Sequence, residues 1–340
     1  MKKIFFTAII LATILTGNKL SAQQTNFSPG EIWKDTEGNA INAHGGGLLL
    51  HKGIYYWFGE IKKGGTVRVA YVTSWEDYRV PAGGVNCYSS NDLLNWKNEG
   101  VALASNTTDS ASDLYTSKVI ERPKVIYNKK TGKFVMWLHL DNEDYSYAHS
   151  GVAVSDKPTG PYHFIKSEKP NGHDARDMTI FQDDDGKAYH LYSSEGNATM
   201  HVTLLSGDYL QHTLIEKRIL IGSSREAPAI IKYNKKYYLF SSGCTGWAPN
   251  AASYAVADQM LGEWKQHDNP CTGKDSAITY TSQSTYAIKV PGKKDAFIFL
   301  ADRWNKTDLP DSRYIWLPMT IKNGKPRISW ADEWNFSFFK

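Results

Sequence analysis

Cysteine is scarce in this chain, with only Cys87, Cys244 and Cys271 among 340 residues. An odd number permits one disulfide and one free thiol in an exported protein, and Cys244–Cys271 is a conceivable pair. No CxxC pair or His/Cys cluster has the spacing of a structural metal site. The run Asp183–Gly186 resembles the start of a calcium loop, but the twelfth position is Ser194, so we interpret it as a hairpin turn. We therefore expect no metal and no cofactor.

The chain also has little net charge. It carries 39 Lys and Arg against 35 Asp and Glu, a formal charge of +4. Three of the lysines fall in the first 22 residues, and the other 36 basic residues leave a net charge of +1. A balance this even gives no basic surface of the kind that binds nucleic acid. We expect no nucleic-acid partner.

Long apolar runs are missing, except near the N-terminus. There, two lysines and the apolar stretch Ile4–Leu15 precede the small residues Ser21 and Ala22. The stretch is shorter than the roughly 20 residues that a membrane-spanning helix needs. This pattern predicts a signal peptide over residues 1–22 and an exported chain, periplasmic or secreted, with no membrane span after cleavage.

Helical periodicity and linker-like segments are nearly absent as well. Composition is even from about residue 26 to the end, which predicts one domain over residues 23–340. Aromatic residues make up 13% of the chain, which suits a β-rich fold. Dense turn signals separate short strands, as at Asn128–Gly132, Asp183–Gly186 and Pro291–Lys294. The sequence is therefore typical of an all-β protein, either a sandwich or a propeller.

Five short polar phrases recur, each followed by a strand rich in aromatic and β-branched residues. The phrases are NAHGGG (Asn42–Gly47), ERPKV (Glu121–Val125), ARDMT (Ala175–Thr179), REAPA (Arg225–Ala229) and SQSTY (Ser282–Tyr286). A unit repeating at roughly 50–60 residues indicates a radial repeat. The first strand of each propeller blade faces the central axis. A five-bladed β-propeller would therefore bring Glu121, Asp177 and Glu226 together in one funnel.

Six phrases in this order, ERPKVIYN, ARDMTIFQDDDGKAY, SSEGNATMHV, REAPAI, SGCTGWAPN and TSQSTY, resemble glycoside hydrolase family 43. The likeness covers essentially the whole mature chain and is closest to the exo-β-1,3-galactanase branch (subfamily 24-like). It implies a five-bladed propeller fold and hydrolysis with inversion of the configuration at the anomeric carbon. It also implies an exo-acting enzyme that releases galactose from β-1,3-galactan, the arabinogalactan backbone. The expected partner is an oligosaccharide or polysaccharide, and we expect a monomer.

Inverting hydrolysis needs a carboxylic acid that protonates the leaving oxygen and a second group that activates water on the opposite face of the sugar. The acid stays protonated near neutral pH only if burial or a neighbouring negative charge raises its pKa. By resemblance, Glu226 is the general acid. Asp177 resembles the carboxylate that raises the acid's pKa, orients it and contacts sugar hydroxyls.

The first phrase lacks the aspartate that most members of the resembled family carry as the base. Its polar side chains are Asn42 and His44, and the galactanase branch shares this departure. Three groups could replace the base: Gln283, Glu121 and Glu60. We favour Gln283 as the group that positions the water, with Glu121 holding substrate or sharing the base role. His44 is interpreted as a hydrogen-bonding or substrate-contact residue.

Sugar binding needs an aromatic platform and hydroxyl partners. Segments similar to substrate-contacting parts of the family contain Tyr147, Asn197, Thr245 and Trp247. Trp247 is the best candidate for stacking on a sugar, and Trp304 and Arg303 are expected at the pocket rim.

Two other functions remain open at this point. An α-L-arabinofuranosidase of the same family would share the ERPK, RD and REAP phrases. A non-catalytic carbohydrate-binding propeller would explain the missing aspartate, although Glu121, Asp177, Glu226 and Gln283 together argue against it.

Overall fold

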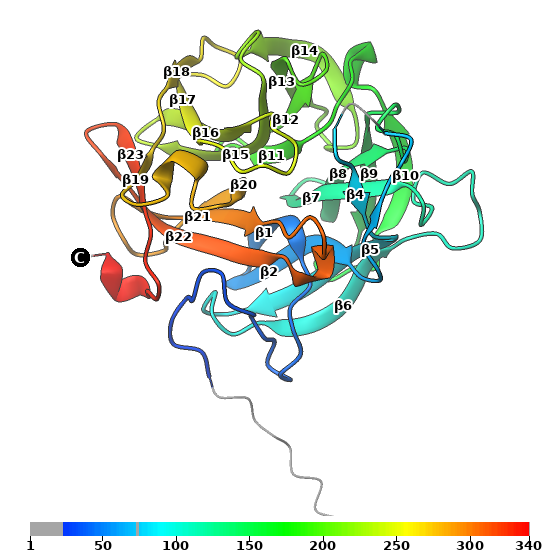
Figure 1. Cartoon of the computed structure of the whole chain (residues 1–340). Helices are drawn as coiled ribbons and strands as arrows, with labels where there is room; N and C mark the ends of the chain where they lie inside the picture. The colour runs from blue at the N-terminus through cyan, green and yellow to red at the C-terminus, as the bar shows by residue number, and fades with distance from the viewer. Residues whose placement is uncertain (1–22, 73–74, 340) are drawn as a thin grey trace, which may run out of the picture.

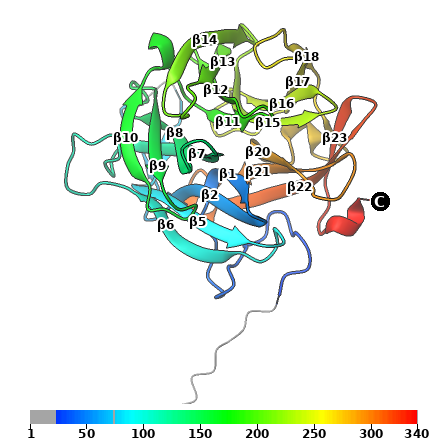
Figure 2. The same ribbon diagram turned by 180° about the vertical axis from the view of Figure 1, so that it is seen from behind.

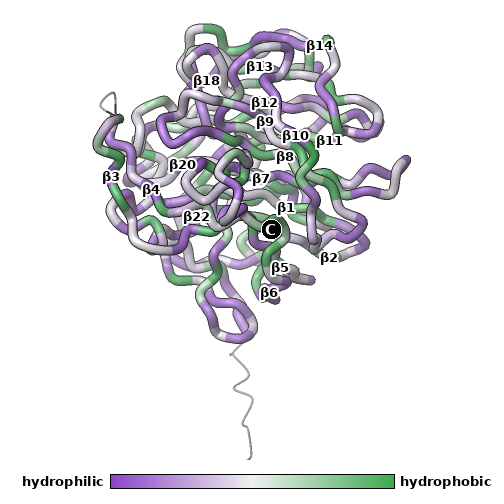
Figure 3. Tube along the Cα trace, turned by 90° about the vertical axis from the view of Figure 1, so that its right-hand side faces the viewer, coloured by the Kyte–Doolittle hydropathy of each residue, from purple (hydrophilic) through white to green (hydrophobic). Residues whose placement is uncertain are grey.

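The computed structural model describes residues 23–72 and 75–339, so the predicted signal peptide lies outside the described residues. Five β-sheets surround a central axis (Figure 1), and the same ring appears from behind in Figure 2. The prediction of a five-bladed β-propeller is confirmed. Among the described residues, no helix is long and apolar enough to cross a membrane, and Figure 3 shows polar and apolar segments interspersed along the chain.

Each blade is an antiparallel sheet whose first strand lies nearest the axis. The first blade contains β1 (His44–His51), β2 (Ile54–Lys62), β5 (Ala82–Ser90) and β6 (Lys97–Ala104). The second contains β7 (Val119–Asn128), β8 (Lys133–Asp141), β9 (His149–Ser155) and β10 (His163–Glu168). The third contains β11 (Met178–Gln182), β12 (Ala188–Ser194), β13 (Thr199–Leu205) and β14 (His212–Ile219).

The fourth blade contains β15 (Arg225–Tyr233), β16 (Lys236–Gly243), β17 (Ser253–Ala257) and β18 (Lys265–His267). The fifth contains β20 (Gln283–Lys289), β21 (Ala296–Arg303), β22 (Arg313–Lys322) and β23 (Lys325–Ser329), and β19 (Cys271–Thr272) adds to it in parallel. A small ribbon of β3 (Val67–Arg68) and β4 (Tyr78–Arg79) lies in the connection from β2 to β5. Short 3-10 turns are η1 (Pro170–Gly172), η2 (Ser276–Ile278), η3 (Leu309–Asp311) and η4 (Phe336–Phe338).

The first strands of the blades form a closed ring. Strand β1 contacts β7, β7 contacts β11, β11 contacts β15, β15 contacts β20, and β20 contacts β1. The polar phrases lie at the beginning of these strands. The ring therefore gathers five polar chain segments at one end of the axis.

The N-terminal segment covers the seam between the first and last blades. Phe27 exchanges two backbone hydrogen bonds with Trp334, at 2.7 and 3.0 Å, and their rings stack at 4.3 Å. Trp33 packs edge-on against Trp316 of β22, at 5.0 Å, and Trp316 contacts Trp57 of β2, at 4.7 Å. Aromatic packing, the Phe27–Trp334 bridge and a hydrogen bond from Gly30 N–H to the Tyr314 carbonyl of β22, at 2.9 Å, thus close the ring. Among the described residues, no N-terminal strand joins the last blade.

The cysteines make no disulfide. Cys87, Cys244 and Cys271 all lie in the described part of the chain and are free thiols. The conceivable Cys244–Cys271 pair is therefore wrong. Cys244 follows β16 at the axis, whereas Cys271 is buried in β19 at the outer edge of the fifth blade.

Candidate active site

A cavity of about 270 Å³ opens where the five first strands begin. Its lining includes the carboxylates Glu60, Glu121, Asp177 and Glu226 and the aromatic residues Trp75, Tyr145, Trp247 and Trp304. Lys62, Arg122, Arg176 and His139 contribute nitrogen groups, and Asn197, Cys244, Gly246 and Gln283 complete the lining. The structure thus brings the four predicted catalytic side chains, Glu121, Asp177, Glu226 and Gln283, into one cavity.

Two of these carboxylates lie on bulges with the same sequence pattern, Glu-x-Pro. The register shifts between Glu121 and Lys124 in β7 and between Glu226 and Ala229 in β15. The middle residue of each pattern, Arg122 or Ala227, has φ of +55°, a conformation that non-glycine residues seldom adopt. Bulges re-aim side chains beside functional sites. Here each bulge accompanies a glutamate at the cavity wall.

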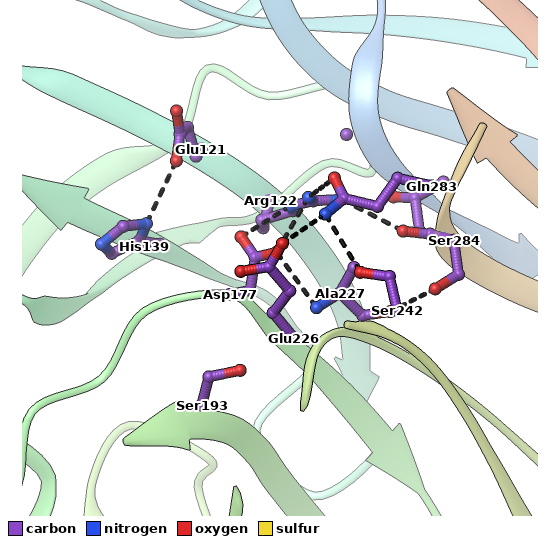
Figure 4. A network of polar contacts seen from close by, with 12 residues as sticks. Glu121, Arg122, His139, Asp177, Ser193, Glu226, Ala227, Ser242, Gln283 and Ser284 are labelled. Carbon is purple, nitrogen blue, oxygen red and sulfur yellow. Dashed lines mark hydrogen bonds and ion pairs between the residues drawn. The ribbon is translucent and has the colours of Figure 1, made fainter. Parts of the chain in front are cut away.

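Glu226 is half-buried in the cavity wall. Its carboxyl accepts a hydrogen bond from Gln283 Nε2, at 2.8 Å (Figure 4). It accepts a second one from Asn197 Nδ2, at 3.3 Å. Burial and the nearby negative charge of Asp177 raise the pKa of Glu226 to about 8. Its carboxyl is therefore mostly protonated at neutral pH, which is the state that a general acid requires.

Asp177 is held by a guanidinium. Arg122 donates to both carboxylate oxygens, from Nε and Nη2, each at 2.9 Å. The backbone N–H of Ala227 donates to Asp177 Oδ2 at 3.0 Å. This bidentate geometry fixes an ionised carboxylate beside the acid. Arg122 was not singled out from the sequence as a site residue, although it lies within the ERPKV phrase.

Gln283 joins the acid to Arg122. Its Oε1 accepts hydrogen bonds from Arg122 Nη2, at 2.6 Å, and from Trp304 Nε1, at 3.1 Å. Its Nε2 donates to Glu226 and to Ser242 Oγ, the latter at 3.1 Å. All the hydrogen-bonding capacity of this amide is used. Its oxygen faces two donors, one of them cationic, so the orientation of the amide is fixed.

Glu121 belongs to a separate network. It accepts a hydrogen bond from the Tyr145 hydroxyl, at 2.9 Å, and lies 3.3 Å from His139 Nδ1, whose Nε2 is 3.0 Å from Asp141. Although burial opposes the charge, Asp141 and Glu121 raise the pKa of His139 to about 9. Burial also disfavours the carboxylate, but His139 and Lys62 hold the pKa of Glu121 well below its usual range. Glu121 is therefore ionised and keeps acceptor capacity for a ligand.

Glu60 is buried at the floor of the cavity. Lys62 Nζ lies 2.6 Å from its Oε2, and the backbone N–H of Arg122 donates to Oε1 at 3.4 Å. Lys124 lies nearby, and burial and the charge of Arg122 lower its pKa to about 7. Burial raises the pKa of Glu60, and the ion pair with Lys62 opposes this rise only in part, so Glu60 stays among the base candidates.

The predicted substrate-binding residues divide into two groups. Asn197 and Trp247 line the cavity, and Trp247 lies 6.0 Å from Trp304 and 6.4 Å from Trp75, measured between ring centroids. His44, Tyr147 and Thr245 lie outside the lining.

Each of these three side chains is engaged elsewhere. His44 is buried behind the wall, with Nδ1 3.2 Å from Asp302 and its ring stacked on Tyr314. The Tyr147 ring stacks on His149 and its hydroxyl contacts Ser167. The Thr245 hydroxyl bonds within its own loop, to the carbonyl of Ala248. His44 thus makes the hydrogen-bonding contact expected of it, and the sugar contacts of these three side chains stay predictions.

Several lining residues were missed from the sequence. Tyr145, two positions before the predicted Tyr147, presents its hydroxyl to Glu121, and Arg79 lies over its ring. Trp75 comes from the connection between β2 and β5, where no repeated phrase marked it. Arg303, expected at the rim, instead donates to the carbonyl of Tyr280. The repeat located the ends of strands but could not locate the loops above them.

Three side chains of the cavity lie close enough together to be considered as ligands of one metal ion. Glu121, His139 and Asp177 offer ligand atoms within 4.8 Å of one another. However, a histidine that binds a metal must be neutral, whereas His139 is protonated between two carboxylates. Asp177 is already paired with Arg122. The negative charges of Glu121 and Asp177 are thus balanced by the protonated His139 and by Arg122.

The comparison with known proteins agrees with this geometry. The model of Glycosyl hydrolases family 43 matches residues 60–326. A solved GH43 β-1,3-galactosidase is 42% identical with a TM-score of 0.85, covering 93% of this chain and 65% of that one. A second one, solved with galactodeoxynojirimycin, is 44% identical with a TM-score of 0.83, covering 91% of this chain and 100% of that one.

The exo-β-1,3-galactanase from Phanerochaete chrysosporium, solved with β-1,3-galactotriose, is 36% identical with a TM-score of 0.81. The match covers 92% of this chain and 68% of that one. This chain thus spans about two thirds of the length of two of these three structures. The match to the family model extends over most of the chain, and it includes all four carboxylates of the cavity. The chain belongs to glycosyl hydrolases family 43.

Proposed function

We propose that this protein is an inverting, exo-acting glycoside hydrolase that releases galactose from the non-reducing ends of β-1,3-galactan. The observation that carries the proposal is the environment of Glu226, a half-buried carboxyl whose pKa is raised to about 8 beside Asp177. The names of the solved relatives, β-1,3-galactosidases and exo-β-1,3-galactanases, support the choice of sugar and linkage.

The proposed reaction is a single displacement. Glu226 gives its proton to the glycosidic oxygen as the bond from that oxygen to the anomeric carbon breaks. A water attacks the opposite face of the sugar, so a β-linked galactose leaves as the α-anomer. Gln283 orients this water, and to do so it gives up its hydrogen bond to Glu226 when the sugar enters between the two side chains. The ionised Glu121 either shares in accepting the proton that the water loses or binds a sugar hydroxyl, in which case that proton passes to solvent water.

The size and walls of the cavity support exo action. Its volume of about 270 Å³ is at the small end of ligand sites, which span about 300–1,000 Å³, and suits one terminal sugar. Trp247 and Trp304 provide apolar ring faces beside the acid. Asn197 and Glu121 provide groups that can bind hydroxyls.

Digestion of β-1,3-galactobiose and β-1,3-galactotriose tests the proposal. Galactose should be the product, and NMR at early times should show it as the α-anomer. Glu226→Gln should lower kcat at least about 100-fold on these substrates, because general acid catalysis typically contributes 10²–10⁴-fold.

The same assays address the rival functions. Release of arabinose from an α-L-arabinofuranoside without release of galactose would contradict the proposal and favour the arabinofuranosidase. Binding of plant glycans with no product from any of them would favour a carbohydrate-binding propeller.

We also propose that the enzyme is exported and acts outside the cytoplasm, because residues 1–22 have the pattern of a signal peptide. Fractionation of expressing bacteria and N-terminal sequencing of the product test this. The mature chain should begin at Gln23, and an intact N-terminus in the cytoplasm would contradict it.

A further inference from the structure

A second group of ligand-type side chains lies on the third blade, outside the catalytic cavity. His173, His201 and Glu216 each offer one ligand atom, and these atoms lie within 4.8 Å of one another. His173 belongs to the connection from η1 to β11, His201 to β13 and Glu216 to β14. The three residues are 28 and 15 positions apart in sequence, so no spacing motif marked them.

The distances fit a small divalent ion. His173 Nε2 lies 3.4 Å from Glu216 Oε1. Two ligands of a tetrahedral zinc ion, each at about 2.0–2.2 Å from the metal, are about 3.4 Å apart. The rings of His173 and His201 are 4.7 Å apart between centroids and inclined at 52°. All three ligand atoms lie within 4.8 Å of one another, so small side-chain movements would bring them to bonding distance of one ion.

His201 carries an unpartnered nitrogen. Its side chain is completely buried, and Nδ1 has no hydrogen-bond partner among the described residues. A buried polar atom without a partner costs about 1–3 kcal/mol, so such atoms are rare unless they serve a ligand. This buried nitrogen is therefore available to bind an ion.

The remaining polar atoms of this group are held by neighbours. His201 Nε2 lies 3.2 Å from Glu195 Oε1, and Arg218 donates twice to the Glu195 carboxylate, at 2.6 Å each. Glu216 Oε2 accepts a hydrogen bond from Asn171 Nδ2 at 2.8 Å. A carboxylate on the far nitrogen of a histidine is the usual outer partner of a metal-bound imidazole.

We propose that His173, His201 and Glu216 bind a divalent transition-metal ion, with zinc the preferred one. Two imidazoles and one carboxylate suit zinc, whereas calcium and magnesium require six or more oxygen ligands. The ion attaches the η1–β11 connection to the outer strands of the third blade. This connection leads directly to Arg176 and Asp177 at the cavity wall.

Zinc titration of the purified, untagged, EDTA-treated full chain tests the proposal. We expect one equivalent of Zn²⁺ by calorimetry, a rise in Tm that EDTA reverses, and no comparable rise with Ca²⁺. Co²⁺ in place of Zn²⁺ should give the intense visible absorption of a four-coordinate site. His173→Ala should weaken Zn²⁺ binding at least 100-fold, and Glu195→Gln about 10–100-fold.

The matched control is His163→Ala, which removes an exposed histidine of β10 that belongs to no ligand group. It should bind Zn²⁺ like the parent. Equal affinity in His173→Ala and the parent, or no stoichiometric binding by the parent, would overturn the proposal. Glu216→Gln provides a second test should His173→Ala not fold, because it preserves the shape of the side chain while removing its charge.

Discussion

The pKa of Glu226 depends on two residue-scale features, its burial and its distance from the charge of Asp177. The acid acts in its protonated form, so kcat/KM should fall as the pH rises through about 8. The charge of Asp177 favours that protonated form. Asp177→Asn should therefore move the falling limb to lower pH by about one unit, together with a loss of activity. The pH profile of kcat/KM measures both effects.

The control for this shift is Asp174→Asn, which removes a carboxylate from the same chain segment. Asp174 pairs with Lys169 at 2.7 Å and lies outside the cavity lining. The falling limb of its kcat/KM profile should lie at the same pH as in the parent protein. An unmoved limb in Asp177→Asn would mean that Asp177 does not set the pKa of Glu226.

Gln283 and Glu121 should respond differently to removal. Gln283→Ala deletes the proposed water-orienting group, so kcat should fall about 100-fold or more with little change in KM. Glu121→Gln removes the charge of a carboxylate that can accept a hydrogen bond from a sugar hydroxyl. If Glu121 serves in sugar binding, KM should rise about tenfold. Steady-state kinetics on β-1,3-galactotriose separates the two effects.

Azide supplies an independent check on Gln283. Azide should partly restore the activity of Gln283→Ala with an activated galactoside and give an inverted galactosyl azide.

A loss of kcat in Glu121→Gln with unchanged KM would instead assign the base role to Glu121.

At this scale the sequence predicted the groups that recurring phrases carry and missed those that other loops supply. The four predicted catalytic residues, Glu226, Asp177, Glu121 and Gln283, lie within three residues of the start of a first strand. The repeat and the family resemblance were therefore enough to find them. Tyr145 and Trp75 lie in connections whose path depends on packing. Tyr147 lies outside the cavity lining, whereas Tyr145, two positions earlier in the same loop, is part of it.

At the scale of single elements, the HGGG run of β1 is required by the close approach of two strands. A Cβ added at Gly46 would lie 1.7 Å from the backbone carbonyl oxygen of Phe58 in β2. Backbone cannot yield as a flexible side chain can. Gly46→Ala should therefore lower the free energy of unfolding by about 3 kcal/mol, the upper part of the usual range for overpacking. Urea denaturation measures this.

Gly65→Ala is the matched substitution at an open position, where an added Cβ would meet nothing within 4 Å. Its effect should stay within about 0.5 kcal/mol. Equal unfolding midpoints for the two variants would contradict a steric role for Gly46. The same region explains His44, since the bulge between His44 and Gly47 turns the strand and places His44 against Asp302 rather than in the cavity.

The strands themselves were predictable because hairpin signals and apolar runs are local in sequence. The bulges at the Glu-x-Pro patterns were not, because they depend on partners across the sheet. Arg122 has φ of +55° and still places its guanidinium on Asp177 of the next blade. Proline restricts the residue before it but does not by itself specify this conformation.

At the scale of the whole molecule, the ring depends on its seam. The number of blades followed from the repeat, but the manner of closure did not, because a pair of chain ends leaves no periodic signal. Phe27 is 1% exposed and joins Trp334 through two backbone hydrogen bonds and a stacked ring. The N-terminal segment therefore acts as a cover that ties the fifth blade to the first.

Phe27→Ala should lower the free energy of unfolding by about 3–4 kcal/mol, as for other large aromatic residues removed from a core. The pH profile and KM should remain those of the parent, because Phe27 lies outside the cavity lining. Ile32→Ala, in the same segment but 54% exposed, should change stability by less than about 0.5 kcal/mol. Equal losses of stability in both variants would contradict a specific role of the Phe27 ring in the seam. A separate early unfolding transition in Phe27→Ala alone would show that the seam opens before the blades do.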